Sequence, residues 1–398
     1  MDGENNTDII VILLDSVRAA STPIHGYHKD ITPNIERFAE EGIVYEQARS
    51  PSNWTIPSFT SMLTGVPTHQ HQMTESTKLE TSETFLTSDP FDSYETSFIT
   101  GMNSLTAPEL GIGACFDITY DCNFTDETFE MVIRDTIQST ENNFSVIHVP
   151  PIDVNAVFHQ KMQTLIENYS DTNVTTTTEM WDVDALLDHS PDWWLEEIQD
   201  IYDEFVQSMD EVFGQILSIL RDIEQYEQSR IVVTSTHGAG MGEVSGIPNA
   251  PRAIGTGLTL HEQNVHVPLV SKPPGAERAD RVVHPVSLTS FKQIALGHDP
   301  QISQGIITSV SQHPPMKKQD YIKEKTNDTR LLEPWRSAYI PDPAPSGGVL
   351  KYSRWNGFAA EQRLVNPASY TPGTPINPDV VDGLFTEENS NIARPQTR

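Results

Sequence analysis

The chain has 398 residues, 37% of them hydrophobic, which is enough to bury the core of one large domain or two smaller ones and argues against a disordered chain. It carries 56 acidic and 25 basic residues, a formal net charge of −31. Such a surface repels nucleic acids and anionic membranes, so we expect neither as a partner.

Two explanations fit the excess of acidic residues. They form a binding surface for a partner, or they adapt the surface to a cytosol very rich in salt, where screening tolerates like charges. We favour the second, halophile-like explanation because the acidic residues are spread along the whole chain. The N-terminal segment Met1–Asp8 is polar and acidic and resembles neither a signal peptide nor a membrane span, so we expect a cytoplasmic location. In a reducing cytosol Cys115 and Cys122 are expected to be free thiols.

The first predicted element is a strand in the apolar run "DIIVILLD" at residues 8–15. Its branched residues are typical of a central parallel strand that is buried on both faces. Asp15 ends this strand, at the edge where open α/β sheets bind their ligands. A helix with a buried apolar stripe is predicted next, at 32–42.

A second helix is predicted in "NWTIPSFTSMLTG", at residues 53–65. Pro57 suits the first turn of a helix, and Gly65 suits its end. This assignment places Thr55 at the N-terminus of the helix or just before it.

Strands and helices alternate along the rest of the first 298 residues. Strands are predicted at 94–101, 143–149, 230–238 and 266–275, and helices at 193–220 and 284–297. Alternation of this kind predicts an α/β fold, a three-layer sandwich in which helices cover both faces of a mostly parallel sheet.

The pattern weakens after residue 298. Proline, glycine, serine and charged residues dominate there without a sustained periodicity. We therefore expect one α/β domain at 1–298, a C-terminal extension with little regular structure at 299–376, and a flexible tail at 377–398.

Three residues suited to one chemical site stand at the ends or turns of predicted elements. They are Asp15, Thr55 and His237, the last in the glycine-rich stretch "TSTHGAGMGE". Oxygen ligands with one imidazole suit a divalent cation. A helix N-terminus attracts an anionic sulfate or phosphate group, and a cation bound to the Thr55 hydroxyl would lower its pKa. The pattern favours a hydroxyl nucleophile that attacks a tetrahedral ester.

The order of these segments resembles the sulfatase family of the alkaline phosphatase superfamily, over residues 8–298. The motifs that carry the resemblance are Asp15 followed by Arg18, "TPN" at 32–34, "TIPS" at 55–58 and "STHG" at 235–238.

The resemblance implies the hydrolysis of a small-molecule or glycan sulfate or phosphate ester with a divalent metal, Ca, Mg, Mn or Zn. It implies that Thr55 is both nucleophile and metal ligand, and that Asp15 and His237 are metal ligands. Arg18 would orient the acid or the glycine-rich turn. The resemblance does not predict the oligomeric state.

The chain departs from the family pattern at the site itself. Thr236 stands where the family has an aspartate, Thr256 where a histidine is usual, and Ala20 where an acidic residue is usual. Losing a group that only supports a metal ligand costs about 10–100-fold in affinity or activity, and losing a ligand should cost more. We therefore expect no tightly held divalent ion unless a nearby carboxylate, Glu243 or Glu262, takes the vacant role.

A second class of function stays open, a non-catalytic protein with the sulfatase fold that binds an anionic glycan or a protein partner. Asp15, Thr55 and His237 favour the enzyme, whereas Thr236, Thr256 and Ala20 favour the alternative.

Other histidines call for a simpler interpretation. His148 and His266 lie in strand-like runs and are expected to be ordinary core or edge histidines. His261 is the histidine that the sequence places closer to the site.

Overall fold

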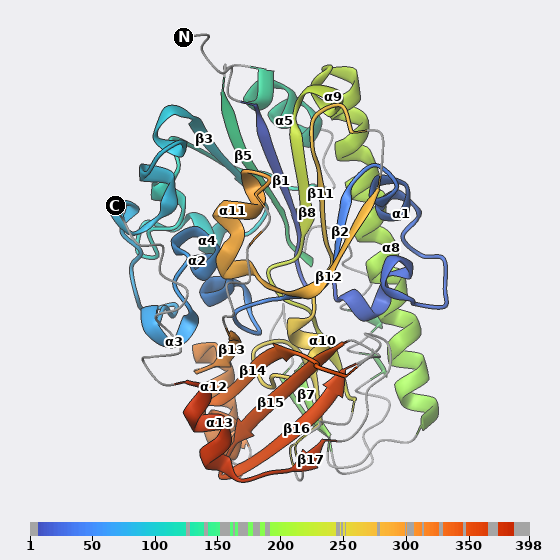
Figure 1. Cartoon of the computed structure of the whole chain (residues 1–398), viewed down its shortest axis with the longest axis vertical. Coiled ribbons are helices and arrows are strands. Elements are labelled where there is room, and N and C mark those ends of the chain that lie inside the picture. Colours follow the sequence, from blue (N-terminus) through green and yellow to red (C-terminus); the bar gives the residue numbers. More distant parts are fainter. Residues whose placement is uncertain are drawn as a thin grey trace.

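The computed structural model arranges the chain as one large sheet and two smaller ones (Figure 1). It describes residues 7–385 apart from 125–127, 139–141, 152–159, 162–163, 166–173, 178–183, 188–191, 244–246, 248–249, 251, 277–278, 299, 301–305, 313, 326–328, 345–347 and 365–372.

The large sheet has eight strands in the order β12-β2-β11-β8-β1-β5-β3-β4. Their bounds are β1 (Ile9–Leu14), β2 (Ile43–Arg49), β3 (Glu95–Thr100), β4 (Ile118–Asp121), β5 (Asn143–Val149), β8 (Arg230–Thr234), β11 (Leu269–Lys272) and β12 (Asp280–Ser287). The central strand β1 runs parallel to both of its neighbours, β5 and β8, whereas β11 runs antiparallel to β2 and β8. The prediction of a mostly parallel sheet is confirmed.

Alternate side chains of β1 enter two different cores, because successive residues of a strand point to opposite faces. Ile10, Ile12 and Leu14 belong to one core, and Ile9 and Val11 belong to the other. The helices of the first core include α1 (Pro33–Ala39), α5 (Thr128–Gln138) and α8 (Asp192–Asp222). The helices of the second core include α2 (Thr55–Thr64) and α11 (Phe291–Ala295). Helices thus cover both faces, which confirms the predicted three-layer sandwich.

The two smaller sheets are largely antiparallel. One contains β6 (Val174–Thr177), β7 (Asp184–Leu187), β10 (Arg252–Gly255) and β9 (Gly240–Met241). The other contains β13 (Ile307–Ser311), β14 (Trp335–Pro341), β15 (Val349–Trp355), β16 (Phe358–Leu364) and β17 (Thr374–Pro375). Further helices in the described part of the chain include α3 (Thr68–His71), α4 (Asn103–Thr106), α9 (Gln225–Gln228), α10 (Glu262–Val265) and α12 (Met316–Lys325).

The five-stranded sheet, called the C-terminal sheet below, occupies the region in which we expected little regular structure. Its core combines Trp335, Tyr339 and Trp355 with Leu260 and Val265 from the α/β part of the chain. Figure 1 shows α10 between this sheet and the large one. Because part of the apolar core comes from residues distant in sequence, the extension alone shows no complete hydrophobic pattern.

A helix, α13 (Pro378–Leu384), stands where we expected a flexible tail. Asn377 accepts a hydrogen bond from the backbone of Asp379 as a cap, Pro378 fits the first turn, and Val381 is buried. The rest of the expected tail, 386–398, lies outside the described residues.

Two further expectations concern chemistry away from the site. Cys115 and Cys122 are both buried free thiols, as expected. In the part of the chain that the structure describes, none of the helices combines the length and the apolar composition that crossing a bilayer requires.

Candidate functional site

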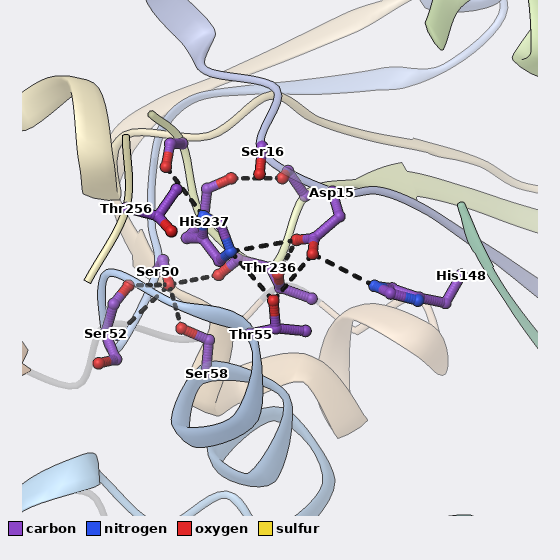
Figure 2. A network of polar contacts seen from close by, with 12 residues as sticks. Asp15, Ser16, Ser50, Ser52, Thr55, Ser58, His148, Thr236, His237 and Thr256 are labelled. Atoms are coloured by element: carbon purple, nitrogen blue, oxygen red, sulfur yellow. Dashed lines mark hydrogen bonds and ion pairs between the residues drawn. The ribbon is translucent and has the colours of Figure 1, made fainter. Parts of the chain in front are cut away.

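Asp15, Thr55 and His237 meet at one edge of the large sheet (Figure 2). The hydroxyl oxygen of Thr55, Oγ1, lies 2.9 Å from Oδ2 of Asp15 and 3.1 Å from Nε2 of His237. Nε2 of His237 lies 3.4 Å from Oδ1 of Asp15. All three side chains are buried. The structure therefore brings together the three residues that the sequence singled out.

The order of the strands and the start of one helix bring these three residues together. Because β1 and β8 are parallel neighbours, with Leu13 opposite Thr234, the residues after both strands emerge at the same edge. Thr55 is the first residue of α2 and follows Trp54, which has an extended backbone. The N-terminus of α2, with the positive end of its dipole, therefore faces the Asp15 carboxylate.

Thr236, the residue that the resemblance places where an aspartate is usual, also contacts Asp15. Its hydroxyl donates a hydrogen bond to Oδ1 of Asp15. Its carbonyl accepts a hydrogen bond of 2.5 Å from the hydroxyl of Ser50, which in turn lies 2.9 Å from Oγ of Ser58 (Figure 2). Thr236 thus holds the place beside Asp15 without adding a negative charge.

The backbone fixes the ring of His237. Nδ1 lies 2.8 Å from the carbonyl oxygen of Gly238, so this nitrogen must carry the donated proton. In the neutral ring the lone pair is then on Nε2, which faces Thr55. Gly238 cannot be larger, because a Cβ there would lie 2.0 Å from the carbonyl oxygen of Gln263.

His148 is the site residue that the sequence interpretation missed. It is buried, but its Nε2 points at the site and lies 3.4 Å from Oδ2 of Asp15 (Figure 2). Its Nδ1 lies 2.8 Å from the hydroxyl of Thr100. In the tautomer that carries its proton on Nε2, the ring turns an N–H toward Asp15 and its Nδ1 accepts from the hydroxyl of Thr100. The feature that could have revealed this role is the position of His148 near the end of β5, directly beside β1, because parallel strands end at the same edge of a sheet.

Arg18 lies against the glycine-rich turn that follows His237. Its guanidinium donates to the carbonyl of Ala239 at 3.2 Å and forms an ion pair with Glu243. It also lies 4.7 Å from the centre of the Tyr202 ring, a cation–π contact. These contacts brace the turn from the side of α8.

The two carboxylates considered as substitutes for the missing aspartate have other partners. Glu243 pairs with Arg18, and Glu262 pairs with Arg49 and Lys351 at 3.0 Å each. Both carboxylates are thus paired with cations, whereas Asp15 is the carboxylate that lies beside Thr55 and His237.

Thr256 and His261 have surroundings that differ from those of the three central residues. The carbonyl of Thr256 accepts a hydrogen bond of 2.5 Å from Nζ of Lys318, a residue of α12. His261 packs edge-on against Trp335, with ring centres 5.4 Å apart. Burial, with a smaller effect from Lys351, lowers the pKa of His261 to about 3. It belongs to the core of the C-terminal sheet.

The spacing of the central groups fits a small divalent cation. Two ligands of a cation with bonds of about 2.0–2.2 Å lie about 3.0–3.5 Å apart, close to the three distances between Asp15, Thr55 and His237. Among the described residues, no three or more histidine, cysteine, aspartate or glutamate side chains form a group that could hold a metal ion. A cation at this place would therefore need the oxygen of Thr55 as a third ligand beside Asp15 and His237.

The surroundings of Asp15 keep it ionised. Burial by itself raises the pKa of its carboxyl group. Electrostatic attraction to the imidazole of His237, the hydrogen bond and attraction of His148, and the hydrogen bond from Thr236 outweigh burial, so the pKa of Asp15 is well below its ordinary value. The site therefore presents a carboxylate at neutral pH.

Comparison with solved structures shows the same fold at low identity. A phosphonate monoester hydrolase of Agrobacterium radiobacter matches with a TM-score of 0.63 and 14% identity, over 92% of this chain and 91% of that chain. A 2-O GAG sulfatase matches with a TM-score of 0.61 and 12% identity, over 90% of this chain and 85% of that chain. A Vibrio parahaemolyticus protein of the alkaline phosphatase superfamily matches with a TM-score of 0.55 and 13% identity, over 98% of this chain and 89% of that chain.

Comparison with sequences gives the family. No curated protein matches the sequence significantly. The sulfatase family model matches residues 7–105 and 91–298, which together span most of the chain and include the three central residues. The chain therefore belongs to the sulfatase family.

Proposed function

We propose that this protein hydrolyses sulfate or phosphate esters, with Thr55 as the nucleophile and a divalent cation held by Asp15, Thr55 and His237. The observation that carries the proposal is the convergence of one carboxylate, one hydroxyl and one imidazole nitrogen within 2.9–3.4 Å of one another. The short spacing favours Mg²⁺, Mn²⁺ or Zn²⁺ over Ca²⁺, whose bonds of about 2.3–2.6 Å need a wider arrangement.

In this proposal Thr55 attacks the sulfur or phosphorus atom of the ester. A new bond forms between Oγ1 and that atom, and the bond from that atom to the ester oxygen breaks; this oxygen takes up a proton from water and leaves as the alcohol. The proton of the Thr55 hydroxyl passes along its hydrogen bond to Oδ2 of Asp15. A bound cation would supply positive charge for the ester oxygens and lower the pKa of the hydroxyl. Water then releases sulfate or phosphate from Thr55.

The N-terminus of α2 supports the binding of an anionic group beside Thr55. Its first backbone N–H groups have no partner within the helix, and its dipole favours negative charge. The structural neighbours include a phosphonate monoester hydrolase and a GAG sulfatase, whose substrates both contain a tetrahedral anionic centre. We therefore propose a small-molecule or glycan ester as the substrate. A cytoplasmic location and a surface adapted to high salt remain predictions from the composition.

One observation favours the alternative function, a non-catalytic protein that binds an anionic glycan or a protein partner. Without a cation, Asp15 already receives hydrogen bonds from Thr55 and Thr236 and lies beside His148. A carboxylate compensated in this way does not require a metal for stability.

The test measures metal binding and turnover together in buffer of high salt concentration. Wild type and the variants Thr55→Ala, Thr55→Ser and Thr64→Ala are assayed on nitrophenyl sulfate, phosphate and phenylphosphonate, with and without Mg²⁺, Mn²⁺ and Zn²⁺. Thr64 ends the same helix and serves as the matched control. The proposal predicts metal-dependent turnover that is lost in Thr55→Ala, reduced in Thr55→Ser and unchanged in Thr64→Ala. Turnover that survives in Thr55→Ala, or wild type that neither binds metal nor cleaves an ester, would refute it.

A further inference from the structure

A buried cluster of charges joins the α/β part of the chain to the C-terminal sheet. Its members are Arg49 at the end of β2, Glu262 at the start of α10 and Lys351 in β15. Oε2 of Glu262 lies 3.0 Å from the guanidinium of Arg49, and Oε1 lies 3.0 Å from Nζ of Lys351. None of the three is more than 4% exposed. One carboxylate therefore holds together two cations from different parts of the fold.

Few other groups compensate these two cations. Nζ of Lys351 donates to the carbonyl of Leu260 at 2.9 Å, and the guanidinium of Arg49 donates to the side chain of Gln47 at 2.9 Å. The Tyr339 ring lies 5.2 Å from the Arg49 guanidinium and 5.7 Å from Nζ of Lys351. Without the carboxylate of Glu262, two buried positive charges would have no carboxylate beside them among the described residues, which is strongly unfavourable.

The short helix that Glu262 begins holds the segments of the candidate site. The carbonyl of Asn264 accepts a hydrogen bond of 2.8 Å from the N–H of Gly238, the residue after His237. The carbonyl of Val265 accepts a bond of 2.7 Å from the N–H of Ser50, whose hydroxyl binds Thr236. Movement of α10 would therefore move both the His237 turn and the support of Thr236.

The C-terminal sheet also binds the segment before Thr55 directly. The N–H of Val310 in β13 donates to the carbonyl of Pro51 at 2.8 Å. The hydroxyl of Ser309 donates to the carbonyl of Ser50 at 2.6 Å. The sheet therefore reaches the site along two routes, one through β13 and one through the charge cluster.

We infer that Glu262 is a positioning residue, which locks α10 between Arg49 and Lys351 and thereby holds the His237 turn in place. The C-terminal sheet, which supplies Lys351, then forms part of the site. The inference rests on the proposed function only in taking His237 as a metal ligand. The contacts themselves do not depend on catalysis.

The test compares Glu262→Gln with Asp210→Asn, a matched loss of another buried carboxylate. Asp210 in α8 binds the backbone N–H groups of Asn34 and Ile35 at the start of α1. Amide hydrogen exchange is followed by mass spectrometry over 236–241 and 262–268, and Mn²⁺ and Zn²⁺ binding by calorimetry.

We expect Glu262→Gln to accelerate exchange in both segments at least about 10-fold and to weaken metal binding by about the same factor. Asp210→Asn should accelerate exchange in α1 and leave both segments and metal binding unchanged. The double variant Glu262→Gln/Lys351→Met removes one of the two uncompensated cations, so exchange should return part of the way to wild type. If Glu262→Gln does not fold, the double variant is compared with Lys351→Met, which keeps the Arg49–Glu262 pair. Amide hydrogens in the two segments should exchange more slowly in Lys351→Met than in the double variant.

Unchanged exchange at 236–241 in Glu262→Gln, or equal acceleration there in Asp210→Asn, would overturn the inference. A double variant that exchanges no faster than Lys351→Met would also overturn it. If the wild type binds neither metal, the proposed function fails, but the exchange results still decide the role of Glu262.

Discussion

Replacing Thr236 by aspartate should restore the carboxylate that the chain lacks. Thr236 already touches Oδ1 of Asp15, so an aspartate there would place its oxygens beside the same point. At an effective dielectric constant of about 20, a divalent cation about 4 Å from a carboxylate gains about 8 kcal/mol, and two carboxylates at that separation repel by about 4 kcal/mol. The repulsion and the burial of the new charge are present with and without metal, so they lower the stability of the metal-free variant and do not reduce the gain in affinity. The cation loses water when it binds, which offsets part of the attraction, and we expect a gain of at least about 1.5–3 kcal/mol, or about 10–100-fold in affinity.

The assay is calorimetric titration of wild type, Thr236→Asp and Thr236→Asn with Mn²⁺ and Zn²⁺ at high salt concentration. Thr236→Asn has the shape of the aspartate without its charge and should bind no more tightly than wild type. Without metal, Thr236→Asp should be less stable than Thr236→Asn, because two buried carboxylates repel each other. Metal should reverse that order.

Equal metal affinities for Thr236→Asp and Thr236→Asn would refute the reasoning, because the missing charge would then not limit binding. An increase in affinity without turnover on any ester would support the non-catalytic alternative, since the metal site would be intact and the reaction absent.

Three further predictions concern the surroundings of the site. His148→Gln should weaken Mn²⁺ binding by about 10–100-fold, because the imidazole no longer orients Asp15. Calorimetry measures the affinity, and an unchanged value would show that His148 does not orient Asp15 for metal binding. Gly238→Ala should lower the melting temperature, since the new methyl group meets backbone 2.0 Å away, and an unchanged value would contradict that contact. Burial lowers the pKa of His25 to about 4 and that of His261 to about 3. As the pH falls, these histidines are therefore protonated in the unfolded chain at a higher pH than in the folded protein. The free energy of unfolding has its full value above about pH 6.5 and decreases as the pH drops toward 4, by up to about 1.4 kcal/mol per pH unit for each histidine. Urea denaturation at several pH values measures how steeply the free energy of unfolding changes with pH. This dependence should be weaker in His25→Gln.

The sequence predicted the central architecture because the information there is local. The run at 8–15 has the continuous apolar pattern of a strand buried on both faces, and β1 has that environment. Thr55 could be placed at a helix start because Pro57 and Gly65 mark the two ends of α2. Since parallel strands end at one edge, the meeting of Asp15 and His237 follows from topology.

The C-terminal sheet could not be predicted in the same way. Its core depends on Leu260 and Val265, and Lys351 is buried only because Glu262 meets it from another part of the chain. From the sequence alone, a lysine in a predicted strand is expected to be exposed, because its buried ion-pair partner is not known.

His148 was misjudged for a related reason. Its run "NFSVIHV" gives the pattern of a buried strand, and the residue is buried in β5. Its contact with Asp15 depends on the order of strands in the sheet, which puts β5 directly beside β1. Periodicity within one strand carries no information about which strand lies next to it.

The most direct test of the central claim is anomalous X-ray diffraction from crystals grown with Mn²⁺ or Zn²⁺. The account predicts one peak within about 2.0–2.3 Å of a carboxylate oxygen of Asp15, Oγ1 of Thr55 and Nε2 of His237. Crystals in which these three side chains lie apart, or in which they keep their arrangement while the metal binds elsewhere or not at all, would contradict it.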